Sequence, residues 1–376
     1  MNEIKICPVI MAGGIGTRFW PESREARPKQ LLEVVTKGST LLEETLKRVS
    51  KFSVAEDTLI ITNRSHLEIL RKHSDHIPEK NIIAEPIGRN TAPCIALAAN
   101  ILRERYGDEA IMIVLPADHL IKNEEEFTRI INRGVRLALA TDGLITLGIH
   151  PTRPETGYGY LQLDEERLPS HNELPNFTEF ELRDIFRVKR FAEKPDKQTA
   201  KLFLESGDFL WNSGMFIWSV RAILAALKEH TEDILEHLKG LPQPGSADFD
   251  GKLADAYSKI RGVSIDYGVM EQAKNVFVLR AGALGWSDVG SWDEVWRLAE
   301  KDMNNNVIEH GKNIIARNSK GCLVLSKSGE LIVLSGVNDL IVVDSGDAIL
   351  ITNRENAQSV KDVVDYLKRN NRTEYL

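Results

Sequence analysis

The chain has 376 residues, of which 42% are hydrophobic and 27% are charged, and its formal net charge is −7. A net negative charge argues against a protein that binds nucleic acid nonspecifically, because such proteins present a basic face. The three cysteines, Cys7, Cys94 and Cys322, are scattered and lack Cys-x-x-Cys spacing, so they form neither a disulfide framework nor a zinc site.

The N-terminus enters an apolar, strand-like run almost at once, which leaves no room for a signal peptide. No apolar stretch approaches the ~20 residues that a membrane helix requires. We therefore expect a cytoplasmic protein without a membrane partner, and the length suggests about two domains.

Predicted strands and helices alternate through the first half of the chain. The strands are the run around Ile4–Ile10, Thr58–Asn63, Ala110–Asp118 and Gly143–Ile149, and the helices are Leu41–Lys51, Pro93–Arg105 and Glu124–Ala140. This alternation predicts βα units and a largely parallel sheet with helices on both faces. Ligands of such sheets bind beyond the carboxyl ends of the strands.

The second half is less regular. It is predicted to contain a polar surface excursion at Leu163–Phe186, a strand at Trp211–Val220, an amphipathic helix at Arg221–Lys239 and a helix at Ser291–Lys301. From Asn313 to Thr352, short strands recur about every 8 to 11 residues, which predicts a small β-helix or a sandwich fragment. A helix over Glu355–Arg369 follows. We place the boundary near residue 302, which gives domains 1–301 and 302–376.

The segment from Met11 to Gln30 is the most informative part of the chain. It follows an apolar strand and contains Gly13, Gly14 and Gly16, whose backbone amides can approach a phosphate closely. Two cations, Arg18 and Lys29, lie in the same connection. It is neither a P-loop, which needs Gly-Lys-Ser/Thr, nor a dinucleotide fingerprint, which needs a third glycine at position 19. The alternative is a plain glycine turn with solvated cations.

The segment resembles the signature G-G-x-G-T-R-[LF]-W-P…P-K-Q of the sugar nucleotidyltransferases, in the form typical of mannose-1-phosphate guanylyltransferases. Trp20-Pro21 and the Arg27–Gln30 ending favour that branch over the thymidylyl and uridylyl branches. The resemblance covers nearly the whole chain. It implies an α/β, Rossmann-like (GT-A-like) mixed-sheet catalytic domain, then a small left-handed β-helix and a terminal helix. The chain is too short for the phosphomannose isomerase domain of the bifunctional members.

Two aspartates are candidate metal ligands. Asp118, in Leu-Pro-Ala-Asp-His, ends a hydrophobic strand, and Asp288 lies in Trp-Ser-Asp-Val-Gly between a strand-like stretch and a helix start. Carboxylates at strand ends suit Mg²⁺, which prefers one or two carboxylates plus phosphate oxygens. Capping or turn formation is the alternative for both residues. In the family that the chain resembles, both motifs bind the metal, Mg²⁺ or another divalent cation such as Mn²⁺.

The segment Glu85–Pro93 is the candidate for nucleobase recognition. Guanine offers two adjacent donors that Glu85 could accept, and adenine would leave this acceptor unpaired. A solvated loop with a helix cap is the alternative. Gly-Arg-Asn-Thr-Ala-Pro is specific to the mannose branch, and the resemblance implies that Asn90 and Thr91 lie near the base.

Three further segments match family motifs around a hexose phosphate: Glu155–Tyr160, Phe191–Pro195 and Trp211–Trp218. Taken alone, they are equally explained by a hairpin, a solvated charge pair and a core strand. The resemblance implies that Glu193 and Asn212 bond sugar hydroxyls and that Lys194 holds the phosphate. It further implies that Gly157 and Tyr158 line the sugar.

The activity implied by the resemblance is transfer of GMP from GTP to α-D-mannose 1-phosphate, which gives GDP-mannose and pyrophosphate. Arg18 and Lys29 would stabilise the transition state by charge neutralisation. The nucleotide would be bound by Gly13, Gly14, Gly16, Thr17, Glu85, Asn90, Thr91 and Asp118. A homodimer is expected by family analogy. The alternatives are a nucleotidyltransferase for another base or sugar and a silent regulatory subunit that binds sugar nucleotide.

Overall fold

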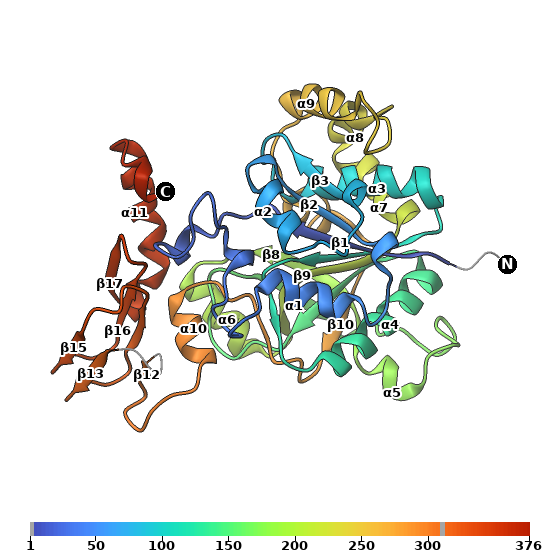
Figure 1. The fold of residues 1–376 in the computed structure, drawn as a ribbon. Coiled ribbons are helices and arrows are strands. Elements are labelled where there is room, and N and C mark those ends of the chain that lie inside the picture. Colours follow the sequence, from blue (N-terminus) through green and yellow to red (C-terminus); the bar gives the residue numbers. More distant parts are fainter. Residues whose placement is uncertain (1–3, 309–312) are drawn as a thin grey trace.

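A nine-stranded sheet forms the centre of the computed structural model, which describes residues 4–308 and 313–376 (Figure 1). The strand order is β3-β2-β1-β4-β9-β6-β10-β8-β7. The strands are β1 (Ile6–Ala12), β2 (Leu59–Asn63), β3 (Ile82–Glu85), β4 (Ile111–Pro116), β6 (Leu144–Ile149), β7 (Gly159–Asp164), β8 (Ile185–Glu193), β9 (Phe209–Ser219) and β10 (Val276–Ala281).

The sheet is mixed, as the family resemblance implies, rather than largely parallel, as the alternation of elements alone predicts. β3, β2, β1 and β4 run parallel, and so do β6 and β10. β9 separates these two groups and pairs antiparallel with both β4 and β6. Alternation of strands and helices alone does not predict this arrangement, because the helix that precedes β9 does not lead to a parallel strand: β9 pairs antiparallel with β4, β6 and β7.

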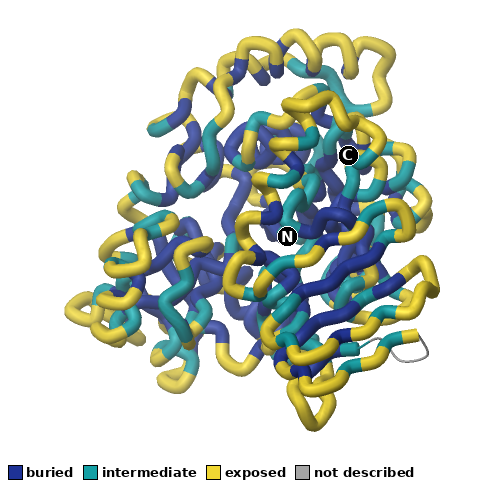
Figure 2. Tube along the Cα trace, turned by 90° about the vertical axis from the view of Figure 1, so that its left-hand side faces the viewer, coloured by how far each residue is buried: buried dark blue, intermediate teal, exposed yellow. Residues whose placement is uncertain are grey.

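Helices cover both faces of the sheet, and each face has its own apolar core. Figure 2 shows the buried residues running through the interior while the connecting loops are exposed. One face packs against α3 (Thr91–Tyr106), α7 (Val220–His230), α8 (Glu232–Leu238) and α9 (Phe249–Lys259). The other packs against α1 (Leu41–Val49), α2 (Leu67–Lys72) and α4 (Glu124–Thr141).

Two of the predicted segments differ from the structure. The helix predicted at Arg221–Lys239 is two helices, α7 and α8, because Thr231 leaves the helical conformation between them. The polar excursion after β7 carries the short helix α5 (Glu179–Leu182) and buries Leu174 and Phe177 in the core. Helix α6 (Lys197–Ser206) then leads into β9.

The C-terminal part is a β-helix-like module beside the sheet domain (Figure 1). The sequence predicts either a β-helix or a sandwich fragment here. The structure has the β-helix arrangement, because β13 pairs parallel with β15, and β14 pairs parallel with both β12 and β16. Hydrogen bonds join successive coils at positions 18 residues apart, as where the Val337 backbone amide donates to the Ser319 hydroxyl at 3.3 Å. Its elements are β12 (Val307–Ile308), β13 (Ile314–Arg317), β14 (Leu323–Ser326), β15 (Ile332–Ser335), β16 (Leu340–Asp344), β17 (Ile349–Asn353) and α11 (Val360–Arg369).

The β-helix module packs directly on the glycine-rich signature segment. Phe19 and Trp20 share an apolar core with Trp292 of α10 (Trp292–Leu298) and with residues of β14, β16 and α11. The indole of Trp292 donates to the Trp20 carbonyl at 3.1 Å, and that of Trp20 donates to the Tyr375 carbonyl at 2.9 Å. The boundary near residue 302 stays a prediction. Over the part of the chain that is described, no helix is both long and apolar enough to span a membrane.

Candidate active site

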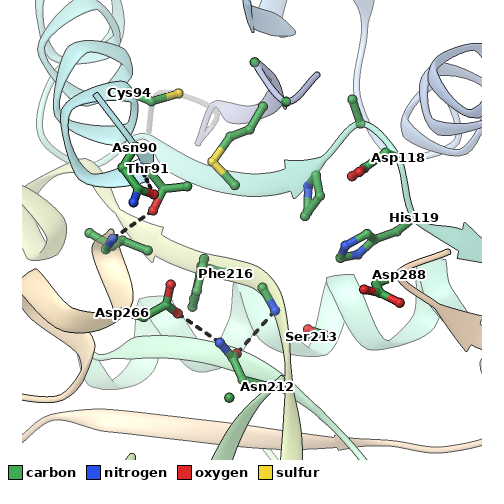
Figure 3. A pocket seen from close by; sticks show the side chains of 18 of the residues that line it. Asn90, Thr91, Cys94, Asp118, His119, Asn212, Ser213, Phe216, Asp266 and Asp288 are labelled. Atoms are coloured by element: carbon green, nitrogen blue, oxygen red, sulfur yellow. Dashed lines mark hydrogen bonds between the residues drawn. The ribbon is translucent and has the colours of Figure 1, made fainter. Parts of the chain in front are cut away.

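A cavity of about 460 Å³ opens at the carboxyl ends of β1, β3 and β4. This position is the one where open α/β sheets bind ligands. Eleven of the sequence-predicted residues line it: Gly13, Gly14, Glu85, Asn90, Thr91, Asp118, Gly157, Tyr158, Glu193, Asn212 and Asp288. Asp118 and Asp288 lie at one side of the pocket, and Asn90 and Thr91 lie at the other (Figure 3).

The signature segment, Met11–Gln30, forms a tight turn after β1 that brings Lys29 against Gly16. Gly16 has φ of 75°, and a Cβ at this position would lie 2.2 Å from Lys29 Cβ. Only glycine fits such a close approach at positive φ. The Lys29 amide donates to the Ile15 carbonyl at 3.1 Å, which closes the loop on itself. The lysine side chain is thereby fixed, and only 7% of Lys29 is exposed.

Lys29, Asp118 and Asp288 form what we call the Lys29 cluster. The Lys29 ammonium lies 2.7 Å from Asp118 Oδ2 and donates to the Asp288 carbonyl at 2.6 Å. Although burial alone would raise it, the ammonium of Lys29 holds the pKa of Asp118 below its ordinary value. The Asp288 carboxylate accepts from the Tyr158 hydroxyl at 2.6 Å. Neither aspartate is the N-cap of the helix that follows it, because Asn123 caps α4 and Ser291 precedes α10.

Two very short strands explain how the aspartates meet across 170 residues of sequence. β5 (Leu120–Ile121) and β11 (Trp286–Ser287) pair antiparallel, with Ser287 opposite Leu120. The residue after Ser287 is thus brought to the residues before Leu120, so Asp288 reaches Asp118. The following residue, Val289, is buried with φ of 44°. A β-branched residue in this region is strained, as residues at functional sites often are.

Glu85, Tyr257 and Asn63 form a second set, the Glu85 group. Glu85 is 5% exposed, and its Oε1 accepts from the Tyr257 hydroxyl at 2.9 Å. Burial raises the pKa of Glu85 to about 7, and the Tyr257 hydrogen bond opposes this shift only in part. The Asn63 amide donates to the Gly13 carbonyl and joins this group to the glycine turn.

Asn90 and Thr91 begin helix α3 beside the Glu85 group. Asn90 has φ of 69°, and its side chain accepts from the Thr91 amide at 2.9 Å, so it caps the helix. The Thr91 hydroxyl accepts from the Ile265 amide at 2.8 Å. Both side chains therefore have structural partners as well as positions on the cavity wall.

Asn212, Asp266 and Glu193 form a third set, the Asn212 group. Asn212 Nδ2 donates to Asp266 Oδ1 at 3.0 Å. Glu193 turns toward Gly159, where a Cβ would lie 2.6 Å from Glu193 Oε2, so glycine leaves room for the carboxylate. Lys194 pairs with Glu193 at 2.8 Å, but its own side chain is 60% exposed. The charge pair predicted for this segment is real, with the acid buried and the base in solvent.

Five sequence-predicted residues are not on the cavity wall: Gly16, Thr17, Arg18, Lys29 and Lys194. Lys29 reaches the wall through Asp118 and Asp288. Arg18 lines a neighbouring polar cavity of about 340 Å³, which shares Gly157, Tyr158 and Asp288 with the first. There its guanidinium donates to Gln358 Oε1 of the β-helix module at 2.8 Å.

Sequence reasoning missed several lining residues, including Asn63, Ser213, Asp266 and Trp286. Asn63 ends β2 beside the glycine turn, so its position at a strand end was a usable signal. Ser213 lies inside a segment that was singled out for its neighbour Asn212. Asp266 begins a π-helical turn, Asp266–Met270, and no strand-end or glycine pattern points to it.

The donor set suits a magnesium ion. The described residues contain no group of three or more His, Cys, Asp or Glu side chains placed to hold a metal. Asp118 and Asp288 supply two hard oxygen donors on one cavity wall. Mg²⁺ is commonly held by one or two carboxylates and completes its shell with water and substrate phosphates. The two aspartates therefore fit such an ion without further protein ligands.

Comparisons with known proteins identify the family of the chain. Residues 7–305 match the family model for nucleotidyl transferases, and residues 312–367 match that for the MannoseP isomerase/GMP-like beta-helix domain. A mannose-1-phosphate guanylyltransferase of Salmonella muenchen is 41% identical, with 99% of this chain and 75% of that protein aligned. One of Escherichia coli is 39% identical over 98% of this chain and 75% of its own length.

A solved structure supports the same assignment. The Thermus thermophilus protein described as a mannose-1-phosphate geranyltransferase superposes with a TM-score of 0.82 and 31% identity. The superposition covers 97% of this chain and 100% of that one. Both the sheet domain and the β-helix module are thus shared with a protein of known structure.

Proposed function

The chain belongs to the nucleotidyl transferase family, and from this membership we propose that it transfers GMP from GTP to α-D-mannose 1-phosphate. Its products are GDP-mannose and pyrophosphate. The relatives named mannose-1-phosphate guanylyltransferase align over nearly its whole length. The observation that carries the proposal is the Lys29 cluster, in which the Lys29 ammonium donates to the Asp118 carboxylate and to the Asp288 backbone carbonyl directly behind a wall lined by both aspartates.

The reaction joins two anions and needs little covalent help from the protein. A phosphate oxygen of the sugar 1-phosphate forms a bond to the α-phosphorus of GTP, and the bond from that phosphorus to the pyrophosphate oxygen breaks. The nucleophile is already ionised, so no general base is required. What the protein must supply is alignment of the two substrates and positive charge near the phosphates.

The chain's own residues divide this work. Gly13 and Gly14 line the wall beside β1, where bare backbone leaves room for phosphate oxygens. Two donors of the Lys29 ammonium are engaged by Asp118 and Asp288, and an ammonium has three donors. We propose that the remaining donor faces the transferring phosphate. Arg18 would act from the neighbouring cavity after leaving Gln358.

We propose Asp118 and Asp288 as the residues that hold Mg²⁺, or another divalent ion such as Mn²⁺. When bound, the ion would supply positive charge that offsets the negative charge growing on the phosphates. Lys29 keeps the Asp118 carboxyl ionised, as a ligand for a hard cation must be.

Base and sugar would bind at the two other groups. Glu85 lies buried on the wall with one oxygen held by Tyr257, and it offers an acceptor for the paired donors of guanine. Glu193, Asn212, Gly157 and Tyr158 would surround the sugar, and Lys194 would reach its phosphate. The homodimer and the cytoplasmic location stay predictions.

A substrate matrix tests the proposal. The purified chain is assayed for pyrophosphate release with GTP, UTP, dTTP or ATP and with mannose or glucose 1-phosphate. The proposal expects GTP with mannose 1-phosphate to give the highest kcat/KM. Faster release with another pair would assign a nucleotidyltransferase of different base or sugar specificity, and no release with any pair would overturn the proposed catalysis.

A further inference from the structure

Asp266 is a cavity residue that no sequence motif indicated. It begins a π-helical turn, Asp266–Met270, that follows helix α9 and a short extended segment. Its side chain is on the wall of the same cavity as Asn212 and Asp288, and Figure 3 shows it pointing toward Asn212. Helical turns with π geometry are rare and occur frequently at functional sites.

The surroundings of Asp266 hold it in place. The Ile265 amide next to it donates to the Thr91 hydroxyl at 2.8 Å. Gly268, in the same turn, packs so closely that a Cβ there would lie 3.1 Å from Thr231 Cγ2. The carboxylate of Asp266 is therefore presented by a rigid turn rather than by a mobile loop.

Hydrogen bonds around Asn212 show which groups face the cavity. Asn212 Oδ1 accepts from the Thr146 hydroxyl at 2.9 Å and from the Gly214 amide at 3.3 Å. These two donors fix the orientation of the amide, so its NH₂ group must face Asp266. One of the two amide hydrogens goes to Asp266 Oδ1, and the other has no hydrogen-bond partner among the described residues, so it can donate to a ligand. Asn212 thus presents a donor, and Asp266 presents acceptors beside it.

The charge around Asp266 favours a neutral ligand group. Among the residues that the structure describes, no cation lies within 4.0 Å of its carboxylate, whereas Glu193 has Lys194 at 2.8 Å. Burial, followed by the nearby charge of Glu193, raises the pKa of Asp266 to about 7, and the charge of Lys194 opposes this shift only in part. A buried carboxyl without a cation needs hydrogen-bond donors, and sugar hydroxyls are such donors. A phosphate placed here would instead be repelled.

We propose that Asp266 is a specificity-determining residue that accepts a hydrogen bond from a hydroxyl of the sugar 1-phosphate, next to the donor supplied by Asn212. This inference rests on the proposed function. A donor and an acceptor placed side by side can both bond to one hydroxyl only if the hydroxyl points toward them. In a sugar epimer whose hydroxyl points away, both protein groups are left unpaired. Such unpaired polar groups reject the wrong substrate strongly.

Steady-state kinetics of Asp266→Asn test the proposal. The variant keeps the size of the side chain but replaces an acceptor oxygen by a donor. We expect the KM for mannose 1-phosphate to rise about 10- to 100-fold, the range for losing a hydrogen bond to a charged group. The KM for GTP should stay within about twofold of the wild-type value. Asp255→Asn, an exposed change on α9 at a residue paired with Lys259, is the matched control and should alter neither constant.

Deoxy analogues of the sugar provide a readout that a merely structural role would not move. The 2-, 3-, 4- and 6-deoxy mannose 1-phosphates are compared in the wild type and in Asp266→Asn. For the analogue that lacks the contacted hydroxyl, the kcat/KM of the wild type should fall by about 10- to 100-fold relative to mannose 1-phosphate. The kcat/KM of Asp266→Asn should be the same for this analogue and for mannose 1-phosphate, because the contact is already absent in the variant. Losses that multiply for all four analogues would overturn the proposal.

Failure of the inference and failure of the proposed function give different results. A wild-type chain without activity on GTP and mannose 1-phosphate overturns the proposed function and the inference with it. An active wild type with an unchanged sugar KM in Asp266→Asn overturns the inference alone. So does a variant in which the GTP KM and the melting temperature shift together with the sugar KM, because that pattern indicates general damage to the fold.

Discussion

Three of the carboxyl groups that line one cavity differ in their surroundings: in the described part of the chain, Asp118 lies beside a cation, whereas Glu85 and Asp266 do not. Asp118 has an ammonium 2.7 Å away that lowers its pKa. Within the described residues, the side-chain hydrogen-bond partners of Glu85 and Asp266 are the neutral groups of Tyr257 and Asn212, and burial raises the pKa of each carboxyl to about 7, although the charge of Lys194 opposes the shift of Asp266 in part. The difference separates two tasks. A cation contacts the carboxylate where phosphates and a metal ion would react, whereas Glu85 and Asp266, where neutral base and sugar donors would bind, form no ion pair with any residue that the structure describes.

Loss of the compensating cation should have the largest effect. Lys29→Ala removes the ammonium that contacts both Asp118 and Asp288, so kcat should fall by about 10²–10³, as when one charge-stabilising donor is deleted. Pyrophosphate release under saturating substrates measures the fall. Lys51→Ala, which breaks a surface pair with Glu124, is the control and should retain wild-type turnover. If both variants turn over alike, the cluster has no catalytic role.

The pH dependence of stability should reveal the contrast directly. The pKa of Glu85 is about 7 in the folded chain against an ordinary value of 4.5. Between these values the folded state binds more protons than the unfolded state, so the contribution of Glu85 to the free energy of unfolding falls as pH rises. Glu85→Gln cannot ionise. The free energy of unfolding of Glu85→Gln, relative to that of the wild type, should therefore rise by about 1.36 kcal/mol per pH unit, up to about 3 kcal/mol between pH 4.5 and 7.

Denaturant unfolding across that pH range measures this gain, with the exposed Glu330→Gln as the control that should show none. Asp118 should act with the opposite sign. Its pKa is lowered, so its stabilising contribution is present above the ordinary value of 3.8 and is lost only as pH falls through the lower folded value. If the difference in the free energy of unfolding between Glu85→Gln and the wild type does not depend on pH, the pKa of Glu85 is not raised in the folded chain.

Arg18 tests whether the second cavity takes part in catalysis. It is predicted to neutralise phosphate charge, although in the structure it donates to Gln358. Arg18→Ala should therefore lower kcat by about 10², near the lower end of the effect of such donors. Arg167→Ala, at an exposed position outside both cavities, is the matched control. Turnover of Arg18→Ala equal to that of the control would remove Arg18 from the catalytic set.

The smallest effect is expected for the neutral partner of Glu85. Tyr257→Phe removes only the hydroxyl that donates at 2.9 Å, and a typical net hydrogen bond of about 0.5–1.5 kcal/mol corresponds to a roughly 2- to 10-fold change. The KM for GTP should rise by this factor while the KM for mannose 1-phosphate stays constant. An equal rise in both constants would indicate damage to the cavity as a whole instead.

The sequence predicted those parts of the site that follow from local pattern. Asp118 was predicted because an apolar strand ends in a carboxylate, and β4 does end two residues before it. The glycine turn was predicted because Gly13, Gly14 and Gly16 directly follow another apolar strand. Lys29 could be singled out as a cation, but its partners lie 89 and 259 positions away, and only the folded chain brings them together.

What the sequence missed has a physical reason in each case. The direction of β9 depends on which edges the earlier strands leave open, and periodicity carries no information on that. Arg18 lies in the second cavity because the β-helix module packs against the signature segment and offers Gln358. Asp266 was overlooked because a π-helical turn has no composition signal of its own.

A crystal structure of the chain with GDP-mannose and Mg²⁺ tests the central claim, that distant segments neutralise charge around one phosphorus. The distance from Lys29 Nζ to the nearest diphosphate oxygen is the decisive measurement. We predict a hydrogen-bonding distance of about 3 Å, with the ion on Asp118 and Asp288, guanine on Glu85 and mannose beside Asn212. A diphosphate bound away from Lys29 and both aspartates would contradict it.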